Sequence, residues 1–159
     1  MAGVINVTAG SQAILTLGNT SVLAAPGAAG GFVVPLVQDI TVTASPGTVR
    51  YSTLDSTSSS AFTTVNENEV SFNMLLDDDA FFGLANTVNK VVNDGLFTTS
   101  TSKTEIHFSV AFEGDTSTDN YIKGQGFIGG LAPNASLEQA VWISPGTIIV
   151  NGELTKDVV

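Results

Sequence analysis

Three features of this sequence could do chemistry: a glycine-rich motif, a run of acids and a single histidine. Residues 124–129, Gly-Gln-Gly-Phe-Ile-Gly, match the pattern GxGxxG. A dinucleotide site requires that pattern between a strand and the start of a helix. Here residues 130–134, Gly-Leu-Ala-Pro-Asn, follow it and favour a loop. We therefore expect these glycines to let adjacent backbones approach closely, and we expect no cofactor.

The acidic run Asp77-Asp78-Asp79 could hold a hard cation, because carboxylates bind calcium and magnesium. The sequence lacks the spaced DxDxDG pattern of a calcium loop, whereas consecutive acids suit the start of a helix. Asp115 and Asp119 lie in a polar stretch that is typical of a hairpin tip. We predict a helix N-terminus at the first place, a solvated tip at the second and no metal at either.

His107 is the only histidine, which excludes a metal site built from several histidines. It could serve as the base for a serine or threonine nucleophile, but that chemistry also needs an orienting acid. The sequence contains no GxSxG motif to support it. We predict that the chain is not an enzyme, and loss of an activity on substitution of His107 would revive the enzymatic hypothesis.

The charge balance argues against nucleic-acid binding. The chain of 159 residues carries 15 acidic and 5 basic residues, and its formal net charge is −10. The basic residues are scattered along it: Arg50, Lys90, Lys103, Lys123 and Lys156. A surface with this balance repels phosphates, so we expect at most transient contact with passing DNA.

The charged fraction is small for a soluble protein. Only 13% of the residues are charged, against about 25% in a typical domain, and the mean hydropathy is +0.29. Either the chain has a large core, or it buries much of its outer surface against copies of itself. The absence of cysteine excludes disulfides and thiolate metal sites.

The pattern predicts one domain, residues 1–159, whose first 38 residues form an uncharged arm and loop region that contacts neighbouring subunits. A single helix is predicted from Asp77, because Phe81, Leu84 and Val88 recur at helical spacing and Asp94-Gly95 should end it. The remaining segments have strand character, with turns expected at the two SPGT sequences. These strands are residues 4–8, 13–17, 32–37, 39–43, 48–53, 69–75, 105–112, 119–129 and 140–154, the last with a bulge or edge position at Pro145. The predicted fold class is mainly β: an antiparallel β-sandwich or barrel with one flanking α-helix.

Four consecutive pieces between residues 67 and 154 carry a resemblance to a known family. They are the alternating strand 69–75, the acid-capped helix 77–85, the hairpin of 105–112 with 119–127, and the stretch 126–141, which runs into a closing strand ending Val150-Asn151-Gly152-Glu153-Leu154-Thr155. In this order they resemble the major tail tube proteins of long-tailed bacteriophages of the siphophage, lambda-type group.

The resemblance implies a virion structural protein that assembles into hexameric rings. The rings would stack into a hollow tail tube through which genomic DNA passes during ejection. It also implies self-association, contact with a tape-measure protein and with tail-terminal and distal tail proteins, no membrane, and a place in the phage tail after synthesis in the host bacterial cytoplasm. The lumen of such tubes is typically lined by acidic and small polar groups, which agrees with the net charge of the chain.

Two sets of residues follow as site predictions. The polar faces of the alternating strands are expected to line the lumen: Glu69, Ser71, Asn73, Glu105, His107 and Ser109. The loops 24–31 and 55–60 are expected to contact the next ring, through Ala25, Pro26, Gly27, Gly30, Asp55 and Ser58.

Other functions remain as alternatives. A capsid decoration protein or a tail-terminator ring would share the β-fold and the acidity, but it would stop at a closed oligomer. A carbohydrate-binding or adhesin module would display an exposed aromatic row, for which Trp142 and Tyr121 are the candidates. We expect Trp142 to be a core aromatic.

Overall fold

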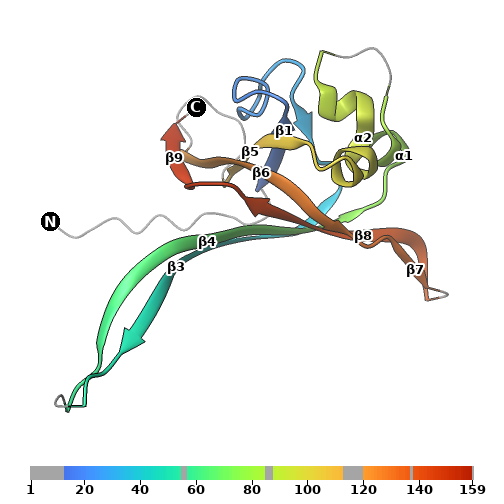
Figure 1. The fold of residues 1–159 in the computed structure, drawn as a ribbon. Helices are drawn as coiled ribbons and strands as arrows, with labels where there is room; N and C mark the ends of the chain where they lie inside the picture. The colour runs from blue at the N-terminus through green and yellow to red at the C-terminus, as the bar shows by residue number, and fades with distance from the viewer. Residues whose placement is uncertain (1–12, 55–56, 85–87, 113–119, 137, 159) are drawn as a thin grey trace, which may run out of the picture.

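The computed structural model describes residues 13–54, 57–84, 88–112, 120–136 and 138–158, and these form one antiparallel sheet with two short helices (Figure 1). The strands are β1 (Ile14–Gly18), β2 (Phe32–Val33), β3 (Val37–Tyr51), β4 (Ser60–Leu75), β5 (Glu105–Ala111), β6 (Asn120–Leu131), β7 (Asn134–Ser136), β8 (Gln139–Val150) and β9 (Thr155–Val158). Their order across the sheet is β2-β1-β5-β6-β8-β4-β3, with β7 paired to β8 and β9 paired to β6. The mainly β class is confirmed, and the sheet is open, since it ends at β2 and β3.

Alternation along the central strands divides the sheet into an apolar and a polar face. In β4, which lies between β3 and β8, Val70, Phe72 and Met74 are buried, whereas Glu69 is exposed, as the alternating pattern predicted. In β5, Ile106, Phe108 and Val110 are likewise buried. These side chains form one core with Leu15 and Leu17 of β1 and with Phe81, Val91 and Leu96 of the helices.

Phe112 is less covered than these residues. It is 37% exposed, because β5 ends at Ala111 and Phe112 lies beyond the last paired position.

The prediction of a single helix from Asp77 to Gly95 is wrong, because the described residues of this region form two helices. The first, α1 (Asp78–Phe82), is capped by Asp77 and ends at Gly83, whose φ is 99°. The second, α2 (Lys90–Thr101), begins after Asn89 and is kinked at Gly95, where φ is 71°. Leu84 and Val88, which were expected on a buried stripe, are exposed.

The two glycines explain this arrangement. A Cβ on Gly83 would meet the backbone of residues 93 and 94, and a Cβ on Gly95 would meet the backbone of residues 81–83. Both also adopt positive φ, which glycine tolerates best. The backbones of α1 and α2 therefore touch, and Gly95 acts at this crossing point instead of ending a helix.

Both SPGT sequences lie inside strands, which corrects their prediction as turns. Pro46 lies in β3, at the edge of the sheet, where a register irregularity separates it from Thr48. An edge strand tolerates the missing N–H of proline. Pro145 lies in β8 opposite Asn73, just beyond the last β6–β8 pair, Leu131 with Gly146. The sequence predicted a bulge or an edge position at Pro145. The nearby register shift lies in β6, the strand paired with β8, between Ile128 and Gly130.

The glycine motif lies within β6, and the described part of the chain places no helix after it. A Cβ on Gly124 would meet the ring of Phe108, and one on Gly126 would meet the carbonyl of Ile149. Gly146 in β8 is similarly covered by the ring of Phe72. Glycine in these strands makes room for core rings and for close backbone approach, as the sequence predicted.

Substitution of Gly146 by alanine should destabilise the fold. The new methyl group would press on the ring of Phe72, which is only 2% exposed. Overpacking of this kind costs about 1–3 kcal/mol. Urea unfolding checks the result, with Gly130→Ala as the control, because a Cβ there meets nothing within 4 Å. Equal unfolding midpoints for the two variants would contradict this account of the packing.

Asn89 should be among the costliest polar residues to remove. It is 0% exposed, and its amide donates to the carbonyls of Leu17 and Gly30, each at 3.1 Å, while its oxygen accepts from the N–H of Val91 at 3.1 Å. Asn89→Ala thus removes a helix cap and the amide donor to the carbonyls of Leu17 and Gly30, which should cost about 2–4 kcal/mol.

The matched control is Asp77→Ala, which removes the cap of α1, an acceptor 3.0 Å from the N–H of Ala80. This variant should lose only about 1 kcal/mol. Thermal or urea unfolding of both variants provides the comparison. A loss at Asn89 no larger than the loss at Asp77 would contradict a structural role beyond capping.

Candidate functional site

The polar side chains that the sequence singled out lie on one face of the sheet. Strand register places Glu69 beside Ile149, Ile149 beside Phe127 and Phe127 beside Glu105. Directly paired residues point to the same side of a sheet, so the β4 and β5 carboxylates share a face. Three inter-strand steps separate them, or about 14 Å.

Further rows extend this polar face toward the sheet edge. Ser71 pairs with Thr41 and Thr147, and Asn73 pairs with Asp39 and Pro145. The apolar side chains of Phe127 and Ile149 also lie on this side, between the carboxylates of β4 and β5. We use the term polar face for these described polar side chains on this side of β3, β4, β8 and β5: Asp39, Thr41, Thr43, Glu67, Glu69, Ser71, Asn73, Thr147 and Glu105. It combines carboxylates with small hydroxyl and amide groups.

The charged side chains on this side of the sheet are mainly acidic. Among the described residues, strands β4, β5, β6 and β8 contribute one cation, Lys123, which forms an ion pair with Asp157. The hydrogen bond that the ammonium of Lys123 donates to the carboxylate of Asp157 raises the pKa of Lys123 above its ordinary value. The exposed carboxylates Glu67 and Glu69 lie two residues apart on β4 and set the sign of the potential.

Hydrogen bonds hold several of the predicted lumen residues in place. The hydroxyl of Ser71 donates to Glu69 at 2.8 Å, and the amide of Asn73 donates to Gln38 at 3.5 Å. Glu105 accepts from the amide of Asn151 at 2.8 Å. These bonds order the carboxylates and leave them open to solvent.

Ser109 does not belong to the exposed part of this face. It is 1% exposed, and its hydroxyl donates to the carbonyl of Ala24 at 2.5 Å. The loop of residues 19–31 covers this end of the sheet, so the polar alternation of β5 continues under it. The expectation that Ser109 presents its hydroxyl to solvent is therefore wrong, and its role is to fix the loop.

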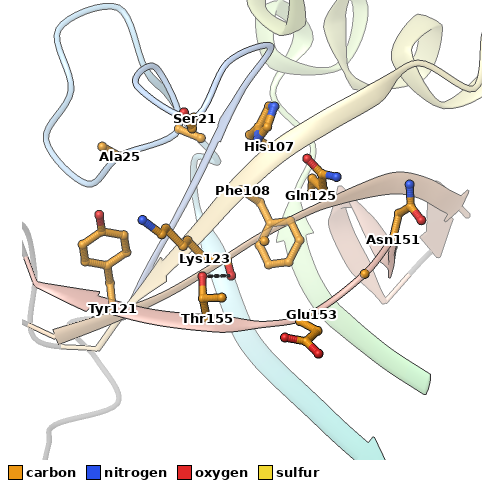
Figure 2. Close-up of a pocket in the computed structure, with 13 residues that line it drawn as sticks. Ser21, Ala25, His107, Phe108, Tyr121, Lys123, Gln125, Asn151, Glu153 and Thr155 are labelled. Carbon is orange, nitrogen blue, oxygen red and sulfur yellow. Dashed lines mark hydrogen bonds between the residues drawn. The ribbon is translucent and has the colours of Figure 1, made fainter. Parts of the chain in front are cut away.

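His107 lies beside a small pocket between that loop and β6 (Figure 2). The pocket has a volume of about 260 Å³ and is lined by Ser21, Ala24, Ala25, His107, Phe108, Tyr121, Lys123, Gly124, Gln125, Asn151, Gly152, Glu153 and Thr155. His107 is half-buried there. The described residues contain no group of three or more histidines and acids that could hold a metal ion.

The hairpin of β3 and β4 forms an arm that projects from the body of the fold (Figure 1). We call residues 48–63 the outer arm. Its described side chains are exposed, including Val49, Tyr51 and Phe62, and the rings of Tyr51 and Phe62 lie 6.0 Å apart. Exposed aromatic and aliphatic side chains on a projecting hairpin mark a surface for association.

The outer side of β3 is an unpaired edge in the described chain. This strand has 15 residues and ends the sheet, so it pairs with β4 alone. A long free edge offers its backbone N–H and C=O groups to another strand.

The predicted ring-stacking residues fall in two different settings. In the loop of residues 19–31, Pro26 is buried and Ala25 half-buried, while Gly27 and Gly30 are exposed at positive φ. This loop therefore lies partly against the sheet. Ser58 is exposed at the end of the arm, and Asp55 lies outside the described residues.

Trp142 is 56% exposed on β8, so the expectation of a core aromatic is wrong. Tyr121, the other candidate for an aromatic row, is only 8% exposed and lies at the start of β6. The two residues therefore form no aromatic platform of the kind that binds sugars.

Sequence reasoning missed the apolar residues of the outer arm and the exposed rings of Phe82 and Phe97 on the helices. A signal was available for the arm. Strand-forming residues continue beyond the proline on both sides of the predicted loop, as Thr-Val-Arg-Tyr at 48–51 and Ala-Phe-Thr-Thr-Val at 61–65.

No helix of the described residues is both long enough and apolar enough to cross a membrane. No family model matches the chain, and no curated protein matches it in sequence.

Solved structures share the fold over nearly the whole chain. One is a chain from the tail of an empty gene transfer agent particle refined with C6 symmetry, with 12% identity, a TM-score of 0.66 and coverage of 96% of this chain and 100% of that one. A second, from the virion of a native gene transfer agent particle, has 10% identity, a TM-score of 0.67 and the same coverage. A third, from the SPP1 tail tube, has 12% identity, a TM-score of 0.65 and coverage of 96% and 80%.

Proposed function

We propose that this chain, which has the tail-tube fold, is the repeating subunit of a hollow virion tail tube. The observation that carries the proposal is the agreement of fold over 96% of the chain with subunits of assembled tails. Stacked six-membered rings are the arrangement we favour, in keeping with the C6 symmetry of one of those tails. The subunit has a structural role and performs no catalysis.

The free edge of β3 supports assembly through shared sheets. An isolated chain with a 15-residue unpaired edge is prone to uncontrolled association, whereas a ring uses that edge for a defined contact. Exposed Tyr51 and Phe62 on the outer arm would then be buried against the next subunit or the next ring. This burial also accounts for the low charged fraction of the chain.

The polar face is our candidate for the wall of the lumen. Its carboxylates at Glu67, Glu69 and Glu105 would repel the phosphates of DNA, and the described strands β4, β5, β6 and β8 supply one cation, Lys123, which is paired with Asp157. A wall of this kind lets DNA slide past, because binding requires cations that release counterions from the phosphates. His107, which is half-buried, contributes less to this wall than the carboxylates do.

The partners follow from this role. The subunit associates with itself, and an open stack of rings needs other proteins to start it, to set its length and to end it. A tape-measure protein inside the tube and terminator and distal tail proteins at its ends are the partners we propose. The location is the tail of the virion.

Assembly of the purified chain is the first test. Negative-stain electron microscopy across a range of concentrations should reveal stacked rings or hollow filaments of constant diameter. The double variant Tyr51→Ser/Phe62→Ser should need roughly tenfold more protein to assemble, since burial of two rings contributes more than 1.4 kcal/mol to the contact.

The control for this experiment is Val88→Ser, which removes a side chain that is 87% exposed just before α2. It should assemble as the parent chain does. Closed single rings that never stack would favour a terminator instead of a tube. Unchanged assembly of the arm variant would exclude the outer arm from the contacts.

Charge reversal on the polar face tests the assignment of the lumen. Tubes of the Glu69→Lys variant should retain double-stranded DNA at low salt and release it as salt rises, because each ring then presents new cations to the phosphates. Glu138→Lys, at an exposed position between β7 and β8, changes the net charge equally and should retain little DNA. Equal retention by both variants, measured by co-sedimentation, would mean that the polar face does not line the lumen.

A further inference from the structure

The connection between β8 and β9 contains a dipeptide with a chemistry of its own, Asn151-Gly152. It is the only Asn-Gly pair in the sequence. In such a pair the backbone nitrogen of glycine can attack the side-chain amide carbon of asparagine, because glycine has no Cβ to hinder the approach. The reaction needs no enzyme, and it is one reason why asparagine counts among the thermolabile residues.

The fold places this pair on a bulge. Strand β8 ends at Val150, which pairs with Gly126 of β6. Strand β9 begins at Thr155, which pairs with Lys123 of the same strand. Four residues, 151–154, therefore face only two residues of β6. The surplus residues must leave the ladder, as they do in a β-bulge.

The backbone nitrogen of Gly152 lies open on this bulge. The residue is exposed, its φ is 97°, and a Cβ placed on it would meet nothing within 4 Å. Among the described residues no acceptor faces its N–H, whereas the N–H of Asn151 donates to the carbonyl of Gln125 at 2.8 Å. The ladder thus holds the first residue of the pair and leaves the attacking nitrogen of the second to solvent.

The side chain of Asn151 is held by strand β5. Its Nδ2 donates to Oε1 of Glu105 at 2.8 Å, and both side chains are exposed. Asn151 and Gly152 also line the open pocket beside β6 (Figure 2). Water therefore reaches both partners of the dipeptide.

We propose that Asn151 is a site of spontaneous modification and that its hydrogen bond to Glu105 sets the rate. The nitrogen of Gly152 gives its proton to solvent and bonds to Cγ of Asn151. The bond from Cγ to Nδ2 breaks, and Nδ2 leaves as ammonia with a proton taken from solvent. Water then opens the cyclic succinimide at either of its carbonyl carbons, which gives aspartate or isoaspartate. The bond to Glu105 slows the first step, because it holds the amide toward β5.

The modification would change the contact with Glu105 from attractive to repulsive. The amide of Asn151 donates a hydrogen bond, whereas the new carboxylate can only accept, so two negative charges would meet in its place. The bulge would lose this tie to β5, and the polar face would gain a carboxylate beside Glu105. The inference concerns a single chain and does not depend on the proposed tube.

The purified full chain provides the first test. Samples stored in buffer would be digested at intervals, and mass spectrometry would follow the conversion of each asparagine. Asn151 should convert roughly tenfold faster than Asn134, an exposed asparagine that alanine follows, because a Cβ hinders the attacking nitrogen. The product should separate into aspartate and isoaspartate peptides of equal mass. Equal rates at the two asparagines, or a product that contains aspartate alone, would overturn the proposal.

Two variants of Glu105 test whether the hydrogen bond sets the rate. Glu105→Ala removes the acceptor and should speed the conversion of Asn151 roughly fivefold. Glu105→Gln keeps a side-chain oxygen that can accept, so its rate should lie between those of the alanine variant and the parent chain. Circular dichroism checks that both variants keep the fold. A rate in Glu105→Ala equal to that of the parent would overturn the role of Glu105.

Discussion

The structure depends on one constraint: the alternation of apolar and polar residues stays in register across strands that are far apart in sequence. Val70, Ile148 and Ile128 meet on one side because β4, β8 and β6 pair at these positions. A shift of one residue in any of these strands would turn its apolar side chains toward solvent. The same register gathers the carboxylates of β4 and β5 on the other side. The core and the polar face are thus two results of one pairing pattern.

Alternation made the central strands predictable. Residues 69–75 and 105–111 have the expected faces, and the positions of β6 and β8 follow from their apolar content. The polar face could also be predicted in part, because Glu69, Ser71, Asn73 and Glu105 lie on the same side of the sheet, as expected. The sequence could not show that a loop covers Ser109, since that contact joins residues 85 positions apart.

The failures have a common cause in tertiary contacts that local patterns do not encode. Pro46 and Pro145 suggested turns, but an edge and a strand junction accommodate them within β3 and β8. Gly95 suggested a helix end, yet it serves the close crossing of α1 and α2. The second half of α2 is rich in threonine and serine, whose hydroxyls bond back to the helix, as Thr99 does to Gly95 at 2.7 Å. Such residues give a weak helical signal in sequence.

The irregularity between Pro46 and Thr48 divides the arm into two parts with different neighbours. On the side of this irregularity that is nearer to the body of the fold, β8 pairs with residues 69–75 of β4 and so holds both strands of the arm to the body. On the far side, in the outer arm, the described residues of β3 and β4 pair only with each other. An irregularity of this kind bends and twists a two-stranded ribbon locally. In a long assembly the bodies would supply stiffness and the outer arms compliance. A tube built in this way could bend along its length while its bore stays round.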